Sequence, residues 1–157
     1  DVKVSEVHGM SQRGGSVVTY VKYGEKVFSP IVDEGEADLI LAFELLEAYR
    51  SLPYLSKTGK VLVNTQEMNQ MPVIIGAAQY PQDIVKKIRD VAQIEAIDAL
   101  KLAQEAGNSK AVNVVLIGVL AREMEIPYEV WIETIKETVP ERFVEVNLRA
   151  FDLGYGK

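Results

Sequence analysis

The sequence predicts an α/β fold of three layers, in which helices cover both faces of a largely parallel sheet. Residues 37–43 and 60–64 are short apolar runs, which is typical of strands buried on both faces. Apolar residues at helical spacing occupy 44–54, between these two runs. Residues 38–64 are therefore predicted to be a strand–helix–strand unit with a right-handed crossover. Helical patterns fill the chain from residue 98 onward. Strands that alternate with helices early, followed by helices alone, indicate a three-layer architecture.

The beginning of the chain is predicted to add a β-hairpin extension. Residues 2–7 alternate apolar and polar side chains, and residues 17–23 are rich in β-branched and aromatic ones, so both are predicted strands. A turn leads from the second strand into 27–31, which makes 17–32 a predicted β-hairpin. Pro30 has no backbone N–H, so its arm is expected to lie at a sheet edge or to end there.

The remaining elements are predicted from apolar spacing and from capping residues. Asp98 is placed to cap a helix that ends at Gly107, because an aspartate accepts hydrogen bonds from backbone N–H groups and a glycine tolerates the left-handed conformation. Trp131 is expected to pack beneath the C-terminal helices. The other predicted elements are a turn at 57–59, a strand at 72–77, a helix from Pro81, a strand at 92–97, and helices at 110–125, from Pro127 and from Pro140.

The composition is that of an ordinary globular protein. The 157 residues are 48% hydrophobic and 25% charged, with no repeat or linker, so 1–157 is predicted to be one domain. There is no cysteine, which excludes disulfides and any iron–sulfur cluster held by thiolates of these residues. A formal charge of −6 without a basic run argues against nucleic acid or an anionic membrane as a partner. We therefore expect a cytoplasmic protein.

The main candidate for a binding site is the glycine-rich stretch between the first two strands, His8–Ser16. Its glycines allow several backbone N–H groups to turn toward one ligand. Arg13 adds a rigid fork of donors that suits a carboxylate or a phosphate. The alternative is a polar connection between two strands that binds nothing. Composition alone favours neither interpretation.

Other residues with chemical potential are few. An acidic cluster, Asp33, Glu34, Glu36 and Asp38, could hold Mg²⁺, but a solvated loop is the commoner role for such a stretch. Asn113 interrupts an apolar helix, where a buried amide must find hydrogen-bond partners, so it is either a structural bridge or a ligand contact. No nucleophile–base set and no complete GxGxxG is present. The sequence therefore assigns no catalytic residue and no metal ligand.

Several stretches together resemble one protein family. They are HGMSQRGGSVVTYVKYG at 8–24, the Ser29–Pro30 pair, EGEADLILAFELLEAYR at 34–50, KAVNVVLIG at 110–118 and NLRAFDLGYG at 147–156. This pattern resembles the gamma-type domain of the 2-oxoacid:acceptor oxidoreductases, in the form of the small subunits of indolepyruvate:ferredoxin oxidoreductases. The GMSQRGG part is the specific one. The family opens with a strand and a GxGGxG-type loop that are not found here, so we expect that a piece is missing from the front.

The resemblance implies a Rossmann-like fold and a shared catalytic task. In proteins of this kind the large subunit carries thiamine diphosphate and iron–sulfur clusters, decarboxylates a 2-oxoacid and passes electrons to ferredoxin, leaving an acyl-CoA. The small subunit packs against the thiamine cleft and helps to shape the coenzyme A side. The implied substrate is indolepyruvate or another aryl pyruvate. The residues implied to contact coenzyme A, substrate or the partner subunit are Gly9, Met10, Ser11, Gln12, Arg13, Gly14, Gly15 and Asn113.

Other functions remain open at the level of the sequence. The chain could be a stand-alone Rossmann-like domain that binds a nucleotide or an anion at 8–16. It could also be a gamma subunit for pyruvate or 2-oxoglutarate. If it is a subunit, it is expected to be inactive alone, with the 8–16 loop and the hairpin as docking surface. Aromatic residues are enriched at interfaces, so Tyr20, Tyr23 and Phe28 are the candidate anchors.

Overall fold

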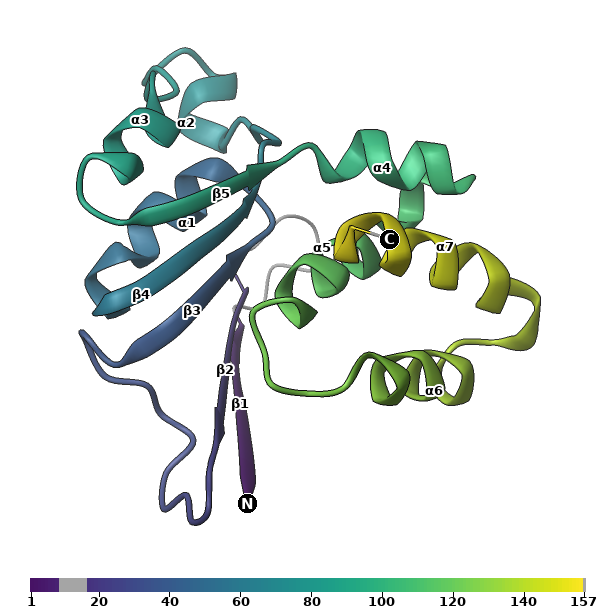
Figure 1. Cartoon of the computed structure of the whole chain (residues 1–157). Helices are drawn as coiled ribbons and strands as arrows, with labels where there is room; N and C mark the ends of the chain where they lie inside the picture. Colours follow the sequence, from purple (N-terminus) through teal and green to yellow (C-terminus); the bar gives the residue numbers. More distant parts are fainter. Residues whose placement is uncertain (9–16, 157) are drawn as a thin grey trace.

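The computed structural model describes residues 1–8 and 17–156 (Figure 1), and its centre is a parallel three-stranded sheet. The strands β3 (Ala37–Ala42), β4 (Leu55–Asn64) and β5 (Gln93–Ile97) lie in the order β3–β4–β5. The central strand is buried on both faces: Val61, Leu62 and Val63 have no exposed surface. This is why their stretch of sequence is a continuous apolar run rather than an alternating one.

One face of the sheet is covered by short helices from the two crossover connections. These are α1 (Leu45–Ser51) with the single 3₁₀ turn η1 (Leu52–Tyr54), α2 (Met71–Ile74) and α3 (Ile84–Arg89). Alternate side chains of the strands point to this face, where Val61 and Val63 pack with Leu45, Ile84 and Ile88. The strand–helix–strand unit and the strand near 92–97 are therefore confirmed.

The other face is covered by the C-terminal helices (Figure 1). They are α4 (Ala99–Ala106), η2 (Ser109–Ala111), α5 (Val112–Ala121), α6 (Tyr128–Thr138), η3 (Glu141–Phe143) and α7 (Val144–Tyr155). Helix α5 lies between the sheet and α7, so it is apolar around most of its circumference. Asp98 caps α4 and Gly107 ends it with φ 103°, as predicted. Trp131 stacks on the buried Phe151 ring, with centroids 6.2 Å apart, so its core role is confirmed.

The N-terminal strands form a separate two-stranded sheet. Strands β1 (Val2–His8) and β2 (Val17–Tyr23) pair in antiparallel register from Val2↔Tyr23 to His8↔Val17. The three layers, the parallel sheet, the hairpin and the helical C-terminal part confirm the predicted fold class. None of the described helices is long and apolar enough to cross a membrane.

Four predictions of secondary structure are wrong. The hairpin at 17–32 does not form, because β2 pairs backward with β1 while 24–36 runs as an irregular connection. The strand predicted at 72–77 is instead α2, since Pro72 fits the first turn of a helix, where no N–H is needed. The turn at 57–59 falls within β4, where the register with β3 shifts between Ala37 and Leu39. The helix at 110–125 ends at Ala121.

Candidate functional site

The predicted glycine-rich site, Gly9–Gly15, lies outside the described residues. The structure does describe the strands on either side of it. Because β1 and β2 pair as far as His8↔Val17, the two ends of this connection are adjacent positions of one ladder. The ladder thus fixes where the stretch leaves and re-enters the hairpin.

Asn113 has a different environment from the one predicted. It lies in the first turn of α5, and its side chain is exposed, whereas the neighbouring Val114 and Val115 are buried. Because position 113 is exposed, the helix does not have to bury an amide there. The premise that this asparagine is buried is wrong. Its role as a contact for a ligand or partner stays a prediction.

The acidic cluster at 33–38 serves the hairpin connection. Glu36 accepts hydrogen bonds from Lys22 Nζ at 2.9 Å and from the backbone N–H of Asp33 at 3.1 Å. The hydrogen bond from Lys22, with that from Asp33, lowers the pKa of Glu36 below its usual range. Lys22 also donates to the carbonyl of Ile31 at 3.0 Å. These contacts tie residues 31–36 to β2, and no group of three metal-ligating side chains occurs among the described residues.

One face of the hairpin exposes several large apolar residues. Antiparallel pairing places alternate residues of both strands on one face. The outward face, called the hairpin face below, carries five large apolar side chains that are 56–61% exposed: Val2, Val4, Val17, Val21 and Tyr23. The opposite face carries Lys3, Ser5 and Lys22, which are partly buried, together with Val7 and Val18, which are 58% and 40% exposed. The hairpin face therefore leaves five large apolar side chains in water, whereas a half-buried sheet turns its apolar face to the core.

The three predicted aromatic anchors have different surroundings. Tyr23 is 60% exposed on the hairpin face, and Phe28 is 86% exposed on the connection that follows. Lys26 Nζ lies 5.0 Å from the centre of the Phe28 ring. Tyr20 points to the inner face, where its ring lies 6.2 Å from that of Tyr54. Tyr23 and Phe28 are therefore available for a partner, whereas Tyr20 fastens the hairpin to the body of the chain.

A buried carboxylate at the carboxyl end of β3 is a feature that sequence reasoning missed. Glu44, only 5% exposed, caps α1 by accepting from the N–H of Glu47 at 2.9 Å. Its other oxygen accepts from the N–H of Met68 at 3.2 Å and from the hydroxyl of Tyr80. Burial, together with the hydrogen bond to Glu44, raises the pKa of Tyr80, so this phenol stays a donor. The sequence does contain a signal for this cap. Glu44 follows an apolar strand directly and precedes Glu47 by three positions, which is the spacing of a helix N-cap and the third residue of its helix.

Asn64 joins the same edge of the sheet at the end of β4. Its amide donates to the carbonyl of Phe43 at 3.2 Å and to Gln66 Oε1 at 3.3 Å. Its oxygen accepts from the N–H of Ala99 at 3.2 Å, and the residue is 1% exposed. One amide thus connects the ends of β3 and β4 to the start of α4. Every polar atom of this network has a partner, so the network positions backbone and offers no free acid or base.

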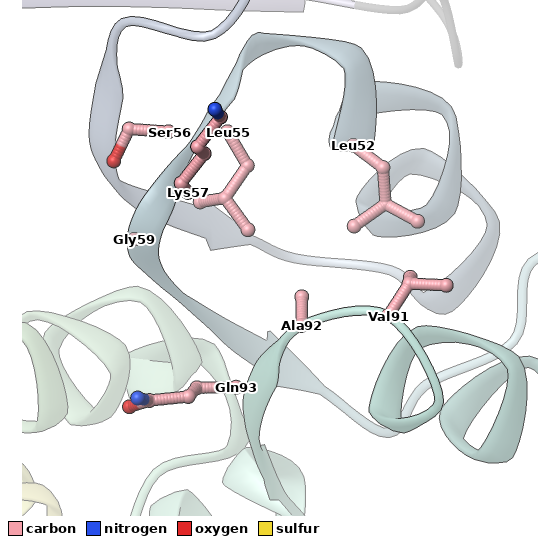
Figure 2. Close-up of a pocket in the computed structure, with 8 residues that line it drawn as sticks. All are labelled: Leu52, Leu55, Ser56, Lys57, Gly59, Val91, Ala92 and Gln93. Carbon is pink, nitrogen blue, oxygen red and sulfur yellow. The ribbon is translucent and has the colours of Figure 1, made fainter.

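Two cavities among the described residues are not lined by Asn113, and only the second includes predicted candidates, Tyr23 and Asp38. The first, about 250 Å³, lies at the amino ends of β4 and β5 (Figure 2). Leu52, Leu55, Val91 and Ala92 converge on it, and Lys57 also lines it. Its remaining lining residues are Ser56, Gly59 and Gln93. It is smaller than the roughly 300–1,000 Å³ of most ligand sites.

The second cavity, about 430 Å³, lies between the end of β2, the start of β3 and the segment after α5. Three carboxylates line it, from Asp38, Glu123 and Glu125. Tyr23, Leu39 and Ile126 complete its lining. Carboxylates at this density repel an anion, so the cavity does not suit a diphosphate or a 2-oxoacid.

Comparison with known proteins decides the family. The sequence model of the pyruvate ferredoxin/flavodoxin oxidoreductases matches residues 1–157. The chain belongs to this oxidoreductase family. Indolepyruvate oxidoreductase subunit IorB of Thermococcus kodakarensis is 47% identical to it over 159 residues, which cover 98% of this chain and 79% of the relative. The subunits of the same name from Pyrococcus horikoshii and Methanothermobacter thermautotrophicus are 45% and 38% identical, covering 98% and 99% of this chain and 79% and 82% of theirs.

Solved structures of this oxidoreductase family share the fold. The gamma subunit of a keto/oxoacid ferredoxin oxidoreductase from Geobacter sulfurreducens matches with a TM-score of 0.65 at 22% identity, covering 99% of this chain and 78% of that one. Pyruvate oxidoreductase subunit PORC from Thermotoga maritima matches with a TM-score of 0.64 at 20% identity, covering 99% and 80%. The arrangement of sheet, hairpin and C-terminal helices is therefore the one found in this oxidoreductase family.

Proposed function

We propose that the chain is the small subunit of an indolepyruvate:ferredoxin oxidoreductase. The observation that carries this proposal is the 36–47% identity, over nearly the whole chain, to relatives that are named as subunits of indolepyruvate oxidoreductase. The reaction is the oxidative decarboxylation of an aryl pyruvate: the 2-oxoacid loses CO₂, its acyl group passes to coenzyme A, and two electrons reduce ferredoxin one at a time. We further propose that the complex works in the cytoplasm.

The cofactors of this reaction belong to the partner subunit in our proposal. Thiamine diphosphate supplies the electron sink that decarboxylation needs, and iron–sulfur clusters carry the electrons. The residues of this chain do not fit either group. There is no cysteine in the sequence, and the larger of the two cavities described is lined by carboxylates that disfavour a diphosphate. The chain's own contribution is then to bind the partner and to help hold coenzyme A or substrate.

The hairpin face is the surface that we assign to this partner. An isolated two-stranded hairpin is marginally stable in water, and this one presents valines and a tyrosine outward. Covering Val4, Val21 and Tyr23 with an apolar surface removes that exposed area from water. The same partner would reach the 9–15 stretch, which leaves and re-enters the ladder at His8↔Val17. We propose Gly9–Gly15 and the exposed Asn113 as contacts for coenzyme A, substrate or the partner.

Two other functions are less well supported. The likeness to subunits named for pyruvate or for keto/oxoacids is at 20–22% identity, well below that to the indolepyruvate relatives. A stand-alone nucleotide-binding domain leaves the hairpin face without an occupant.

A substrate comparison tests the proposal. The chain is co-expressed with the large subunit, and the purified complex is assayed with coenzyme A, ferredoxin and indolepyruvate, pyruvate or 2-oxoglutarate in turn. We expect kcat/KM for indolepyruvate to exceed that for the other two acids by at least about tenfold. A preference for pyruvate or 2-oxoglutarate would contradict the assignment of the substrate, and failure to form a complex would contradict the assignment as a subunit.

A further inference from the structure

A second apolar surface lies far from the hairpin, on the segment that connects β4 to α3 (Figure 1). Helix α2 turns one of its residues, Val73, toward the core beneath α1 and α3. Met71, Ile74 and Ile75 are spaced as neighbours on one helix face and are 65–68% exposed. Met68, just before them, is 52% exposed. Met68, Met71, Ile74 and Ile75 are called the loop surface below.

The segment is also free of charge. Residues 68–82 contain no Asp, Glu, Lys or Arg, in a chain of which 25% is charged. A solvated loop is usually polar, whereas the core of a protein interface is depleted in charge and enriched in methionine and other large apolar residues. The loop surface has the composition of an interface core.

The loop is held in place before anything binds to it. Glu44 accepts from the backbone of Met68 at one end of the loop and from the hydroxyl of Tyr80 at the other. Between these ends, Gln70 donates to Glu47 Oε1 at 3.1 Å and accepts from Arg50 at 3.0 Å. Hydrogen bonds of Gln70 and of the Met68 backbone therefore hold the loop against α1, while Met71, Ile74 and Ile75 stay exposed. Fixing a loop in advance lowers the entropy cost of binding.

The occupant is a protein surface rather than a small molecule or a second copy. Small ligands bind in concave sites, and the two cavities described above are lined by other residues. A stable dimer buries about 800 Å² per copy, which four partly exposed side chains do not supply. Two copies that each carry a charge of −6 also repel each other.

We propose that the loop surface is a second docking site for the large partner subunit, which contacts the chain both here and at the hairpin face. This inference rests on the proposed function, because it takes its partner from there. A large subunit that covers both surfaces removes the exposed apolar side chains of each from water, which is the main driving force of association.

The test uses the complex of the full chain with its partner subunit. The variant Met71→Ser/Ile74→Ser removes the centre of the loop surface. Val91→Ser is the matched control, because Val91 is 73% exposed and lies outside both surfaces. The fraction of assembled complex is measured by mass photometry over a dilution series, and thermal melting confirms that both variants are folded.

We expect the double variant to raise the Kd of the complex by at least about tenfold and the control to change it by less than about twofold. An unchanged Kd in the double variant would overturn the inference. So would a dimer of the chain alone, seen by light scattering, that the double variant dissolves, because the occupant would then be a second copy. If the wild-type chain does not bind the partner, the proposed function itself fails, and this inference fails with it.

Discussion

Glu44 shows how one side chain can organise a loop of the protein. It is buried at the end of β3, where it caps α1 and holds both ends of the following loop through Met68 and Tyr80. A buried carboxylate is costly unless its oxygens accept hydrogen bonds, and here three donors supply them. The position of the loop surface therefore depends on this residue.

Removing the Tyr80 hydroxyl should weaken this arrangement. Tyr80→Phe keeps the buried ring but takes one of three donors from Glu44, so we expect the free energy of unfolding to fall by about 1–2 kcal/mol. Tyr23→Phe, on the exposed hairpin face, is the control and should change it by less than about 0.5 kcal/mol. Urea denaturation measures the free energy of unfolding of each variant. Equal stability of the two would show that the hydrogen bond to Glu44 contributes nothing.

Asn113 should behave as a contact residue rather than a structural one. Its side chain is exposed on α5, so Asn113→Ala should leave the thermal melting of the chain within the range of ordinary surface changes, about 0.5 kcal/mol. In the assembled enzyme the same variant should raise the KM for coenzyme A while decarboxylation without coenzyme A stays close to normal. A large loss of stability with an unchanged KM would contradict this role.

The packing of elements depends on two glycines where α5 crosses α7. A Cβ at Gly154 would overlap the backbone carbonyl of Val115, and one at Gly118 would overlap that of Phe151. Glycine in a helix interior costs about 1 kcal/mol of stability relative to alanine. At these two positions the missing Cβ allows the backbones of α5 and α7 to come into close contact.

Gly154→Ala should therefore be destabilising in spite of alanine's better helix propensity. We expect a loss of about 1–3 kcal/mol in the free energy of unfolding, because backbone atoms of α5 would have to move. Gly24→Ala is the control, since a Cβ at Gly24 meets nothing within 4 Å. Chemical denaturation compares the two. A Gly154→Ala variant as stable as the wild type would show that the helices can separate at little cost.

An ion-pair network fastens the end of α5 to the sheet. Lys60 Nζ lies 3.0 Å from Glu95 and 2.7 Å from Glu123, and Arg122 also pairs with Glu95. Partial burial raises the pKa of Glu95, but the hydrogen bonds from Lys60 and Arg122 outweigh it and leave the pKa below its ordinary value of 4.5. A carboxyl with a lowered pKa in the folded state stabilises the fold above pH 4.5, and this contribution disappears as pH falls through the lowered value.

Glu95→Gln should thus reduce stability at pH 7 by up to about 1 kcal/mol, because such partly exposed pairs are worth little each. The difference from the wild type should shrink steadily below pH 4.5. Denaturation midpoints measured between pH 7 and pH 3 test the sign. A difference that grows toward low pH would mean that burial dominates the environment of Glu95.

The elements that sequence reasoning predicted best are those whose signal is local. The apolar run at 60–64, the cap at Asp98 and the glycine stop at Gly107 determine structure by themselves, and all three are confirmed. The predicted partner of β2 was wrong. Either β1 or the segment 27–31 could have supplied its backbone hydrogen bonds, and β1 supplies them although it is separated from β2 in the sequence. The apolar residues at 72–77 suggested a short strand, whereas Ile74 ends α2, Ile75 follows it, and both are exposed.

The candidate site was less predictable than the fold. Asn113 was expected to be buried because its neighbours are apolar, but position 113 is the one at which this turn of α5 is exposed to solvent. Glu44 and Tyr80 lie 36 positions apart in sequence and meet only in the folded chain, so no local pattern indicates their contact. The predicted Gly9–Gly15 site stays a prediction.

At the scale of the whole molecule, the chain combines a packed α/β body with two apolar surfaces that face outward. Its sequence offers no cysteine for a cluster and no complete dinucleotide loop. We also propose that residues 1–157 form one domain, because helices from the middle and from the C-terminal part of the chain pack on the two faces of one sheet. This organisation suits a component that works by binding a partner.

The most direct test measures ferredoxin reduction with indolepyruvate and coenzyme A in three samples: the full chain alone, the large subunit alone, and the two mixed. Our account predicts turnover in the mixture and none in the chain alone, because electron transfer and decarboxylation need groups that we propose the partner to hold. Turnover by the chain without a second polypeptide would contradict it.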